Sequence, residues 1–258
     1  MNDVQIRRAV VDDEARIREL LRESQLPFED VGKHLVNFLV AEHNNAVVGA
    51  VGLEVYGEIA LLRSLAVKAS HKNKGIGRKL YDGIIAYARL KGVNRFYLLT
   101  TTADQLFRKL GFIDVDRNRL PDEIRMTDEF RRLCPETAIC MAKDIDKDIY
   151  YVPKSMQDLA ESVPGARMLA VPLERAMLTY FEVAPGTKFE RHKHESEQIT
   201  FVIEGELFFE IDGRVVRVGP GEVIAIPSNA PHAAYAENEH VRAVDAWSPV
   251  RIDFIQKT

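Results

Sequence analysis

A change of pattern near residue 145 constrains the fold of this chain more than any other feature of its sequence. Before it, apolar strand-like runs alternate with stretches of helical periodicity, as in α/β proteins. From Val163 onward, short strand-like runs are separated by Pro-Gly, Asp-Gly and Gly-Pro-Gly turns, which are typical of an all-β barrel or sandwich. We therefore predict two domains, residues 1–145 and 146–258, each long enough to bury its own core.

The N-terminal half is predicted to form a mixed sheet covered by helices. A meander of strands precedes the first long helix, and the order strand, helix, strand that follows favours a parallel pair. The C-terminal half shows no apolar stripe of helical length. The predicted strands of the first half are residues 4–9, 37–43, 46–56, 59–67, 95–100 and 138–142, and its helices begin near Asp12 and span 75–91 and 103–110.

Composition excludes several classes of function. A net charge of -4 and the absence of a basic stripe argue against a nucleic-acid partner. No run approaches the roughly 20 apolar residues of a membrane helix, and MNDVQIRRAV lacks the apolar core of a leader, so we expect a cytoplasmic protein without a membrane partner. Cys134 and Cys140 lack CxxC spacing and are interpreted as reduced packing residues.

A glycine-rich segment opens the predicted long helix. Glycines leave backbone N–H groups unobstructed at a helix N-terminus, where phosphate oxygens bind, and the alternative is a plain helix entry with solvated basic residues. The segment lacks the Gly-Lys-Ser/Thr of a P-loop and has Leu80 where a dinucleotide fold needs glycine. The candidate phosphate-binding residues are Lys72, Asn73, Lys74, Gly75, Ile76, Gly77 and Arg78.

This segment resembles the acetyl-coenzyme A loop of the GCN5-related N-acetyltransferases (GNAT), R/Q-x-x-G-x-G/A, with Lys72 in the basic position. The resemblance covers residues 4–143 and implies an acetyl-CoA-dependent N-acetyltransferase of GNAT fold. It also implies that the backbone of Leu65, Ala66 and Val67 pairs with the pantetheine arm and that residues 72–78 hold the pyrophosphate.

Three further segments, LLRSLAV, FYLLTTTADQLFRKLGF and RLCPETAICM, are similar to arsenic-resistance N-acetyltransferases. This similarity implies a small amino-acid-like amine as acceptor. Many members carry a proton-donating Tyr where this chain has Phe107, so that water or Thr101 would protonate the departing thiolate, unless it leaves without a dedicated acid.

The strand at residues 59–67 offers candidate acceptor-binding groups. We interpret Arg63, beside Ser64, as a ligand for a substrate carboxylate, and Glu54 as the group that takes the ammonium proton through water. The alternative for both charged residues is a surface ion pair.

The segment GTKFERHKHESEQITF carries a candidate metal site in the second half. Side chains alternate across a strand, so His192, His194 and Gln198 would share one face of a single strand, with His232 arriving from a neighbour. Lys193 between them should point outward. The alternative is an empty barrel with core histidines.

The spacings G-x5-H-x-H-x3-Q-x6-G from Gly186 and G-x5-P-x-N-x2-H from Gly221 resemble the two-part cupin signature. A cupin implies a double-stranded β-helix barrel with a divalent metal, and zinc, nickel, iron and manganese all stay open. Gln198 replaces the usual glutamate. The spacing of Asp245, Trp247 and Arg251 is similar to cupins of pectin degradation that open unsaturated uronates, which implies an acid or base aspartate and a carboxylate-binding arginine. The alternative is a barrel-end ion pair.

Three roles for the second domain follow from these resemblances. It could regulate the transferase as a ligand or metal sensor, it could catalyse a second step on a carboxylated substrate, or it could pair two chains into a homodimer, as cupin barrels often do.

Overall fold

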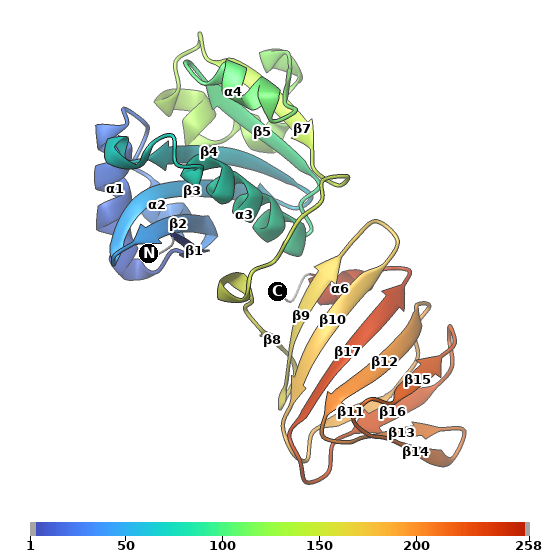
Figure 1. Cartoon of the computed structure of the whole chain (residues 1–258). Coiled ribbons are helices and arrows are strands. Elements are labelled where there is room, and N and C mark those ends of the chain that lie inside the picture. The colour runs from blue at the N-terminus through green and yellow to red at the C-terminus, as the bar shows by residue number, and fades with distance from the viewer. Residues whose placement is uncertain (1–3, 256–258) are drawn as a thin grey trace. The chain divides into compact units, whose positions relative to one another are not determined.

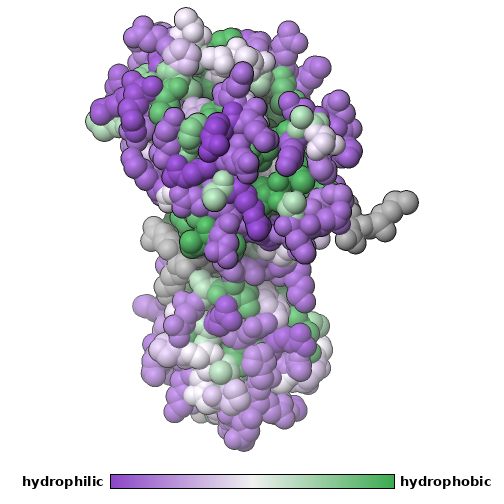
Figure 2. Space-filling model, turned by 90° about the vertical axis from the view of Figure 1, so that its left-hand side faces the viewer, coloured by the Kyte–Doolittle hydropathy of each residue, from purple (hydrophilic) through white to green (hydrophobic). Residues whose placement is uncertain are grey.

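The computed structural model describes residues 4–255, and the chain divides into two compact units, residues 1–156 and 157–258. The N-terminal unit extends beyond residue 145 because Met156 is buried in its hydrophobic core and Tyr150 packs against that core. Among the described residues, none of the helices has both the length and the apolar character that a membrane crossing requires. The face shown in Figure 2 is mostly hydrophilic, with hydrophobic residues gathered in small patches.

The N-terminal unit is built on a seven-stranded sheet in the order β1-β2-β3-β4-β5-β7-β6 (Figure 1). Neighbouring strands are antiparallel except β4 and β5, which run parallel as predicted. The strands are β1 (Gln5–Arg8), β2 (Phe38–His43), β3 (Ala46–Tyr56), β4 (Ile59–Val67), β5 (Arg95–Thr100), β6 (Ile113–Asp114) and β7 (Ile139–Asp144).

Helices cover both faces of this sheet, because consecutive apolar residues of its central strands point to opposite sides. In β2, Phe38 packs with α1 residues, whereas Leu39 packs with α3 residues. The helices predicted at 75–91 and 103–110 are confirmed to within one residue at each end, and the α-helix predicted near Asp12 begins at Glu14. The helices α2 and α5 and a π-helical turn are too short to show periodicity. The helices are α1 (Glu14–Glu23), α2 (Val31–His34), α3 (Ile76–Leu90), α4 (Asp104–Lys109), α5 (Asp122–Arg125) and the π-helical turn η5 (Glu129–Leu133).

Strand β4 separates from β5 partway along its length. Ile59–Leu61 pair with Arg95–Tyr97, and no further pairing joins these two strands within residues 4–255. On the β3 side the register shifts near Ser64, whose φ of 59° places it in the left-handed region, so that the strand bulges there. The edge of Leu62–Val67 that faces β5 therefore presents backbone groups without a strand partner.

The C-terminal unit consists of two antiparallel sheets, as expected for a cupin barrel (Figure 1). Residues alternate between the interior and the outer surface. In β12, for example, Thr200 and Val202 are buried, whereas Ile199 and Phe201 are exposed. The six-stranded sheet has the order β15-β12-β17-β10-β9-β8 and the four-stranded sheet β11-β16-β13-β14. The elements are β8 (Ala160–Val163), β9 (Ala166–Pro172), β10 (Met177–Val183), β11 (Lys188–His192), β12 (Glu197–Glu204), β13 (Leu207–Ile211), β14 (Arg214–Val218), β15 (Val223–Ile226), β16 (His232–Tyr235), β17 (Val241–Ser248) and the short α6 (Ile252–Ile255).

Candidate functional sites

The start of α3 forms an open cradle of backbone donors. Asn73 and Gly75 both have positive φ, 61° and 75°, so the loop turns sharply before the helix. The first α-helical hydrogen bond runs from Lys79 N to Gly75 O at 3.0 Å, and no side chain caps the helix. A Cβ on Gly75 would meet nothing within 4 Å. The N–H groups at this helix start therefore face open space, as an anion-binding site requires.

The cradle adjoins the free edge of β4. A Cβ built on Gly77 would lie 3.8 Å from Val67 Cγ2, so the end of the strand and the first helical turn are in contact. Lys72 and Lys74 are exposed beside the loop, whereas Arg78 is held in an ion pair with Asp82 at 2.8 Å. The predicted pyrophosphate and pantetheine segments thus lie next to each other, beside two exposed lysine side chains.

The predicted position of the proton donor to the thiolate is occupied by a buried phenylalanine. Phe107 lies on α4, is 7% exposed and packs edge-on against Phe112 with ring centroids 5.4 Å apart. Thr101 is exposed in the turn that follows β5. No phenol is available at residue 107 to protonate a thiolate.

Arg63 on β4 is buried among three carboxylates. Its side chain is 0% exposed, and it binds Asp30 through two hydrogen bonds of 2.7 and 2.6 Å and Glu54 through one of 2.5 Å. Glu129 completes the set, with Oε2 3.0 Å from Arg63 Nε. The alternative interpretation of Arg63 and Glu54 as a surface ion pair is therefore wrong, because these side chains are buried. Asp30 and Glu129 were missed, since no local pattern links positions so distant in sequence.

Burial governs the ionisation of this network. Burial raises the pKa of Glu129 to about 7, and the neighbouring Glu54 and Asp30 carboxylates act in the same direction. Burial also disfavours the charged form of Arg63, but hydrogen bonds from its guanidinium to Asp30 and the nearby carboxylates hold its pKa above the ordinary value. Because the guanidinium is fully engaged, binding of a substrate carboxylate by Arg63 stays a prediction that this geometry does not favour.

Two further groups join the network at Glu54. The Tyr56 hydroxyl donates to Glu54 Oε2 at 2.9 Å, and His34 Nε2 lies 3.7 Å from the same oxygen. His34 is 23% exposed, whereas Glu54 is 2% exposed, so the histidine is the more accessible titratable group beside Glu54. Ser64 Oγ is 3.4 Å from Arg63 Nε at the bulge. Sequence reasoning missed His34, which lies on the short α2 helix.

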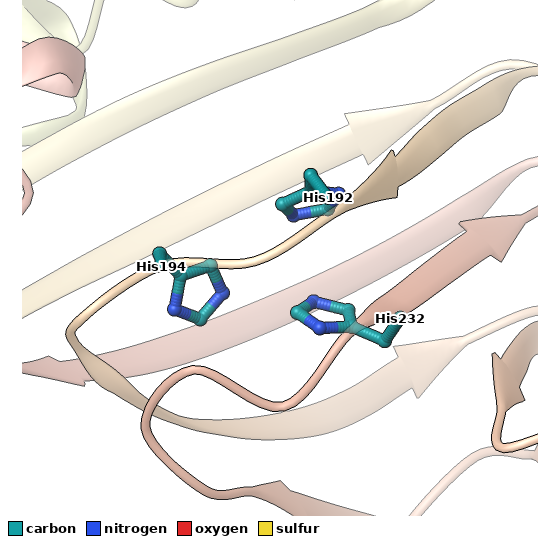
Figure 3. A group of neighbouring side chains, drawn as sticks. All are labelled: His192, His194 and His232. Carbon is teal, nitrogen blue, oxygen red and sulfur yellow. The ribbon is translucent and has the colours of Figure 1, made fainter.

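In the second unit, three histidines converge although they do not share one strand (Figure 3). The prediction that His192, His194 and Gln198 lie on a single strand is wrong, because β11 ends at His192, residues 193–196 belong to no strand and Gln198 belongs to β12. His232 begins β16 and pairs directly with His192. One ring nitrogen from each histidine lies within 4.8 Å of the others.

Backbone carbonyls fix the orientation of all three rings. Nδ1 donates to Glu190 O at 2.7 Å in His192, to Ser196 O at 2.6 Å in His194 and to Ala230 O at 2.8 Å in His232. With the proton on Nδ1, each Nε2 keeps its lone pair for a ligand in the centre. Burial lowers the pKa of His194 and of His232, which favours the neutral rings that metal binding needs. The donor set therefore fits a divalent metal ion.

Gln198 connects this cluster to the barrel interior. Its Oε1 lies 3.2 Å from His194 Nε2, while its Nε2 donates to Thr200 Oγ1 at 3.0 Å and to Asp245 Oδ2 at 3.3 Å. The amide oxygen and the His194 lone pair thus face one another, as two ligands of one cation do. Burial raises the pKa of Asp245 to about 7, against the opposing hydrogen bonds from Thr200 and Gln198.

A cavity of about 350 Å³ opens beside the histidines. Arg251 lies at this cavity and binds Asp253 through Nε at 3.0 Å and Nη2 at 2.8 Å. The alternative of an ion pair between Asp245 and Arg251 is not what the structure contains, because the partner of Arg251 is Asp253. Trp247 lies on the same wall and donates to Thr179 Oγ1 at 2.8 Å.

Comparisons with known proteins agree with both halves of this description. The Acetyltransferase (GNAT) family matches residues 7–112, and the Cupin domain matches residues 179–247. An uncharacterized N-acetyltransferase of Chlorobaculum tepidum is 32% identical over 97 residues, which cover 37% of this chain and 62% of that protein. The amino-acid acetyltransferase of Escherichia coli K12 is 26% identical over 141 residues, which cover 50% of this chain and 31% of that protein.

Among solved structures, N-acetylglutamate synthase from Neisseria gonorrhoeae, complexed with coenzyme A and N-acetyl-glutamate, is 25% identical with a TM-score of 0.50. The match covers 56% of this chain and 36% of that chain. The matches thus cover less than two thirds of the length of each of these three proteins. The N-terminal unit is a GNAT acetyltransferase domain, and the C-terminal unit is a cupin domain.

Proposed function

We propose that the N-terminal unit transfers the acetyl group of acetyl-CoA to the amine of a small amino-acid-like molecule. The observation that carries this proposal is the junction of the free β4 edge, Leu65–Val67, with the uncapped start of α3. Backbone groups of an unpaired strand suit the amides of pantetheine, and a helix start with open glycines suits its pyrophosphate. The relatives named as amino-acid and N-acetyltransferases support the reaction class.

Few residues of this chain take a direct part in the proposed acetyl transfer. The amine nitrogen attacks the thioester carbonyl, a C–N bond forms, the C–S bond breaks and coenzyme A leaves as its thiol after gaining a proton. An ammonium group must first lose its proton, and we assign this step to Glu54, through water or His34, with Tyr56 and Arg63 fixing the carboxylate. Water or Thr101 supplies the proton to the thiolate, because Phe107 has none.

The acceptor is proposed to be an amino acid or a close analogue. An amino-acid acetyltransferase among the relatives supports this class, and the segments LLRSLAV and RLCPETAICM support the arsenic-resistance type, whose relatives acetylate phosphinothricin-like amino acids. A transferase for such acceptors needs a cationic partner for the substrate carboxylate. For Arg63 to bind the substrate carboxylate, the acceptor must displace one of the three carboxylates that contact Arg63.

Gly75→Ala tests the cofactor site at the glycine that the loop motif requires. The added methyl would meet nothing within 4 Å, and the φ of 75° at this residue lies in the left-handed region, so the variant should be about 1–2 kcal/mol less stable. The affinity for coenzyme A, measured by titration calorimetry on the full chain, should fall at least about tenfold, because the methyl group stands where phosphate oxygens approach the helix N–H groups.

Gly57→Ala is the matched control for this measurement. Its Cβ would also meet open space, but it lies in the turn between β3 and β4, away from α3. This variant should bind coenzyme A like the wild type. Equal affinity for coenzyme A in the wild type and both variants would show that the helix start is not the pyrophosphate site. No binding of coenzyme A by the wild type would overturn the proposed activity.

For the cupin unit we propose a divalent metal held by His192, His194, His232 and Gln198. The carbonyl-oriented rings and the inward-facing amide oxygen of Gln198 support this ligand set. When bound, such an ion supplies a Lewis acid that polarises a substrate oxygen. Asp245, held by Gln198 and cross-strand from Thr200, is placed to hold or move a proton beside that position.

A further inference from the structure

We infer that the outer face of the six-stranded sheet joins two copies of this chain, face to face, around a two-fold axis. The inference goes beyond the proposed function, because it concerns a surface of the cupin unit and neither of the candidate sites. It rests on a band of outward-facing apolar side chains, where an antiparallel sheet commonly presents polar ones, and on the way in which this band complements itself in size and charge.

The band crosses four neighbouring strands, β15, β12, β17 and β10 (Figure 1). On β12, Ile199 and Phe201 are 51% and 43% exposed, because they alternate with the buried Thr200 and Val202. Strand pairing extends each of these two positions sideways into a row. Exposed apolar patches of this extent mark interaction surfaces. The two rows are Ala225, Ile199, Ala246 and Leu178, and Val223, Phe201, Val244 and Tyr180.

Strands with large outward side chains alternate with strands that carry smaller ones. An axis parallel to the strands, between β12 and β17, would place β12 of each copy over β17 of the other, and β10 over β15. Each strand with large side chains would then lie over a strand with smaller ones, so that the two faces interdigitate. The large side chains are Ile199 and Phe201 on β12 and Leu178 and Tyr180 on β10, and the smaller ones are Ala246 and Val244 on β17 and Ala225 and Val223 on β15.

The same axis matches the charges at one end of the band. Glu204 is the cross-strand neighbour of Arg242, with which it forms an ion pair, and both side chains are about half exposed. Under the two-fold axis, Glu204 lies opposite Arg242 of the partner subunit, so unlike charges meet across the interface. At the other end, Glu197 lies opposite Ser248 of the partner subunit, because these two positions are also cross-strand neighbours. A face that complements itself in this way selects a second copy of the chain.

The face is large enough to hold two copies together. Strands β12 and β17 contain 8 residues each, which is roughly 27 Å at about 3.4 Å per residue, and four strands about 4.8 Å apart are roughly 19 Å across. Two such faces have a combined flat area of roughly 1,000 Å², which is about the total area that a specific interface needs.

Sedimentation of the full chain tests the inference. The wild type should sediment as a dimer at micromolar concentration. Ile199→Glu should weaken the association at least about a hundredfold, because the charge would be buried near the axis and would be present twice. Ile252→Glu is the matched control, since this isoleucine is 66% exposed on α6, outside the sheet, and the variant should sediment like the wild type.

Exchange of the charged pair tests the position of the axis. Arg242→Glu should weaken the dimer at least about tenfold, because carboxylates would then face each other across the interface. Adding Glu204→Arg to this variant should restore the association, because unlike charges would meet again.

Several outcomes would overturn the inference. These are a wild type that stays monomeric at millimolar concentration, an Ile199→Glu variant that sediments like the wild type, and an Ile252→Glu control that dissociates equally. A charge exchange that does not restore the dimer would overturn the proposed axis. Fluorescence of Trp247, the only tryptophan and a buried one, verifies that each variant is folded in this unit.

Discussion

Replacing Arg63 with methionine is expected to lower the free energy of unfolding of the N-terminal unit by about 3–5 kcal/mol near pH 8. Methionine keeps much of the buried volume but removes the only cation that contacts Asp30, Glu54 and Glu129 among the described residues. Three buried carboxylates would then lack their counter-charge. The loss should be smaller near pH 5, where the carboxylates can take up protons instead.

Calorimetric unfolding of the two units measures this effect. Arg108→Met is the matched control, because Arg108 also contacts two carboxylates, Asp104 and Asp114, but is 44% exposed. That variant should unfold at nearly the same temperature as the wild type, because exposed ion pairs contribute little to stability. Similar losses in both variants would show that the Arg63 network is not a buried charge cluster in solution.

Glu129→Gln tests how the stability of the N-terminal unit depends on pH. The pKa of Glu129 rises from 4.5 to about 7 on folding, so the folded state holds this proton more tightly than the unfolded chain. The stability that this group contributes is therefore greatest below about pH 4.5 and is lost as the pH rises through about 7. Glutamine cannot ionise, so the variant should gain stability relative to the wild type between about pH 5 and pH 8.

Replacing His232 with alanine is expected to reduce the affinity of the cupin unit for a divalent metal by more than about a hundredfold. Loss of second-sphere partners alone typically costs 10- to 100-fold, and this change removes a proposed ligand. His232 is 1% exposed and donates from Nδ1 to Ala230 O, so its Nε2 is fixed toward the other two rings. A metal present at about 100 times its dissociation constant should stabilise the wild-type unit by about 2.7 kcal/mol.

Trp247 provides the signal for this titration, because its ring lies 5.1 Å from that of His194. Adding Ni²⁺ or Mn²⁺ should quench its fluorescence in the wild type and in His240→Ala, which changes an exposed histidine outside the cluster. His232→Ala should respond only at much higher metal concentration. An unchanged titration in this variant would remove His232 from the proposed ligand set.

The order of elements could be predicted from the sequence, because each long element carries its own periodicity. The apolar stripe of α3 and the continuous apolar runs of β3 and β4 depend only on neighbouring residues, and the observed bounds differ little from the predicted ones. The separation of β4 from β5 after Leu61 has no such local signal. It reflects tertiary pairing, as does the bulge at Ser64.

The candidate site residues could likewise be predicted only where their signal is local in the sequence. The histidine triad could be listed from spacing alone, and His232 comes from a neighbouring strand as predicted, but the placement of His192, His194 and Gln198 on one strand was wrong because residues 193–196 interrupt the strand. Glu54 was named from the sequence, but Asp30 and Glu129 could not be listed, since they are brought to β4 by separate helical segments. Spacing identifies ligands that lie close in sequence, whereas buried charge networks require the folded chain.

The central claim is that the N-terminal unit acetylates small amino-acid-like amines. Its most direct test is release of coenzyme A thiol from acetyl-CoA by the full chain, over a panel of amino acids that includes phosphinothricin and arsenic analogues. The account predicts thiol release that depends on one class of carboxylated amine and is lost in Gly75→Ala. No thiol release with any member of the panel, or equal release with and without an amine, would contradict the proposed activity.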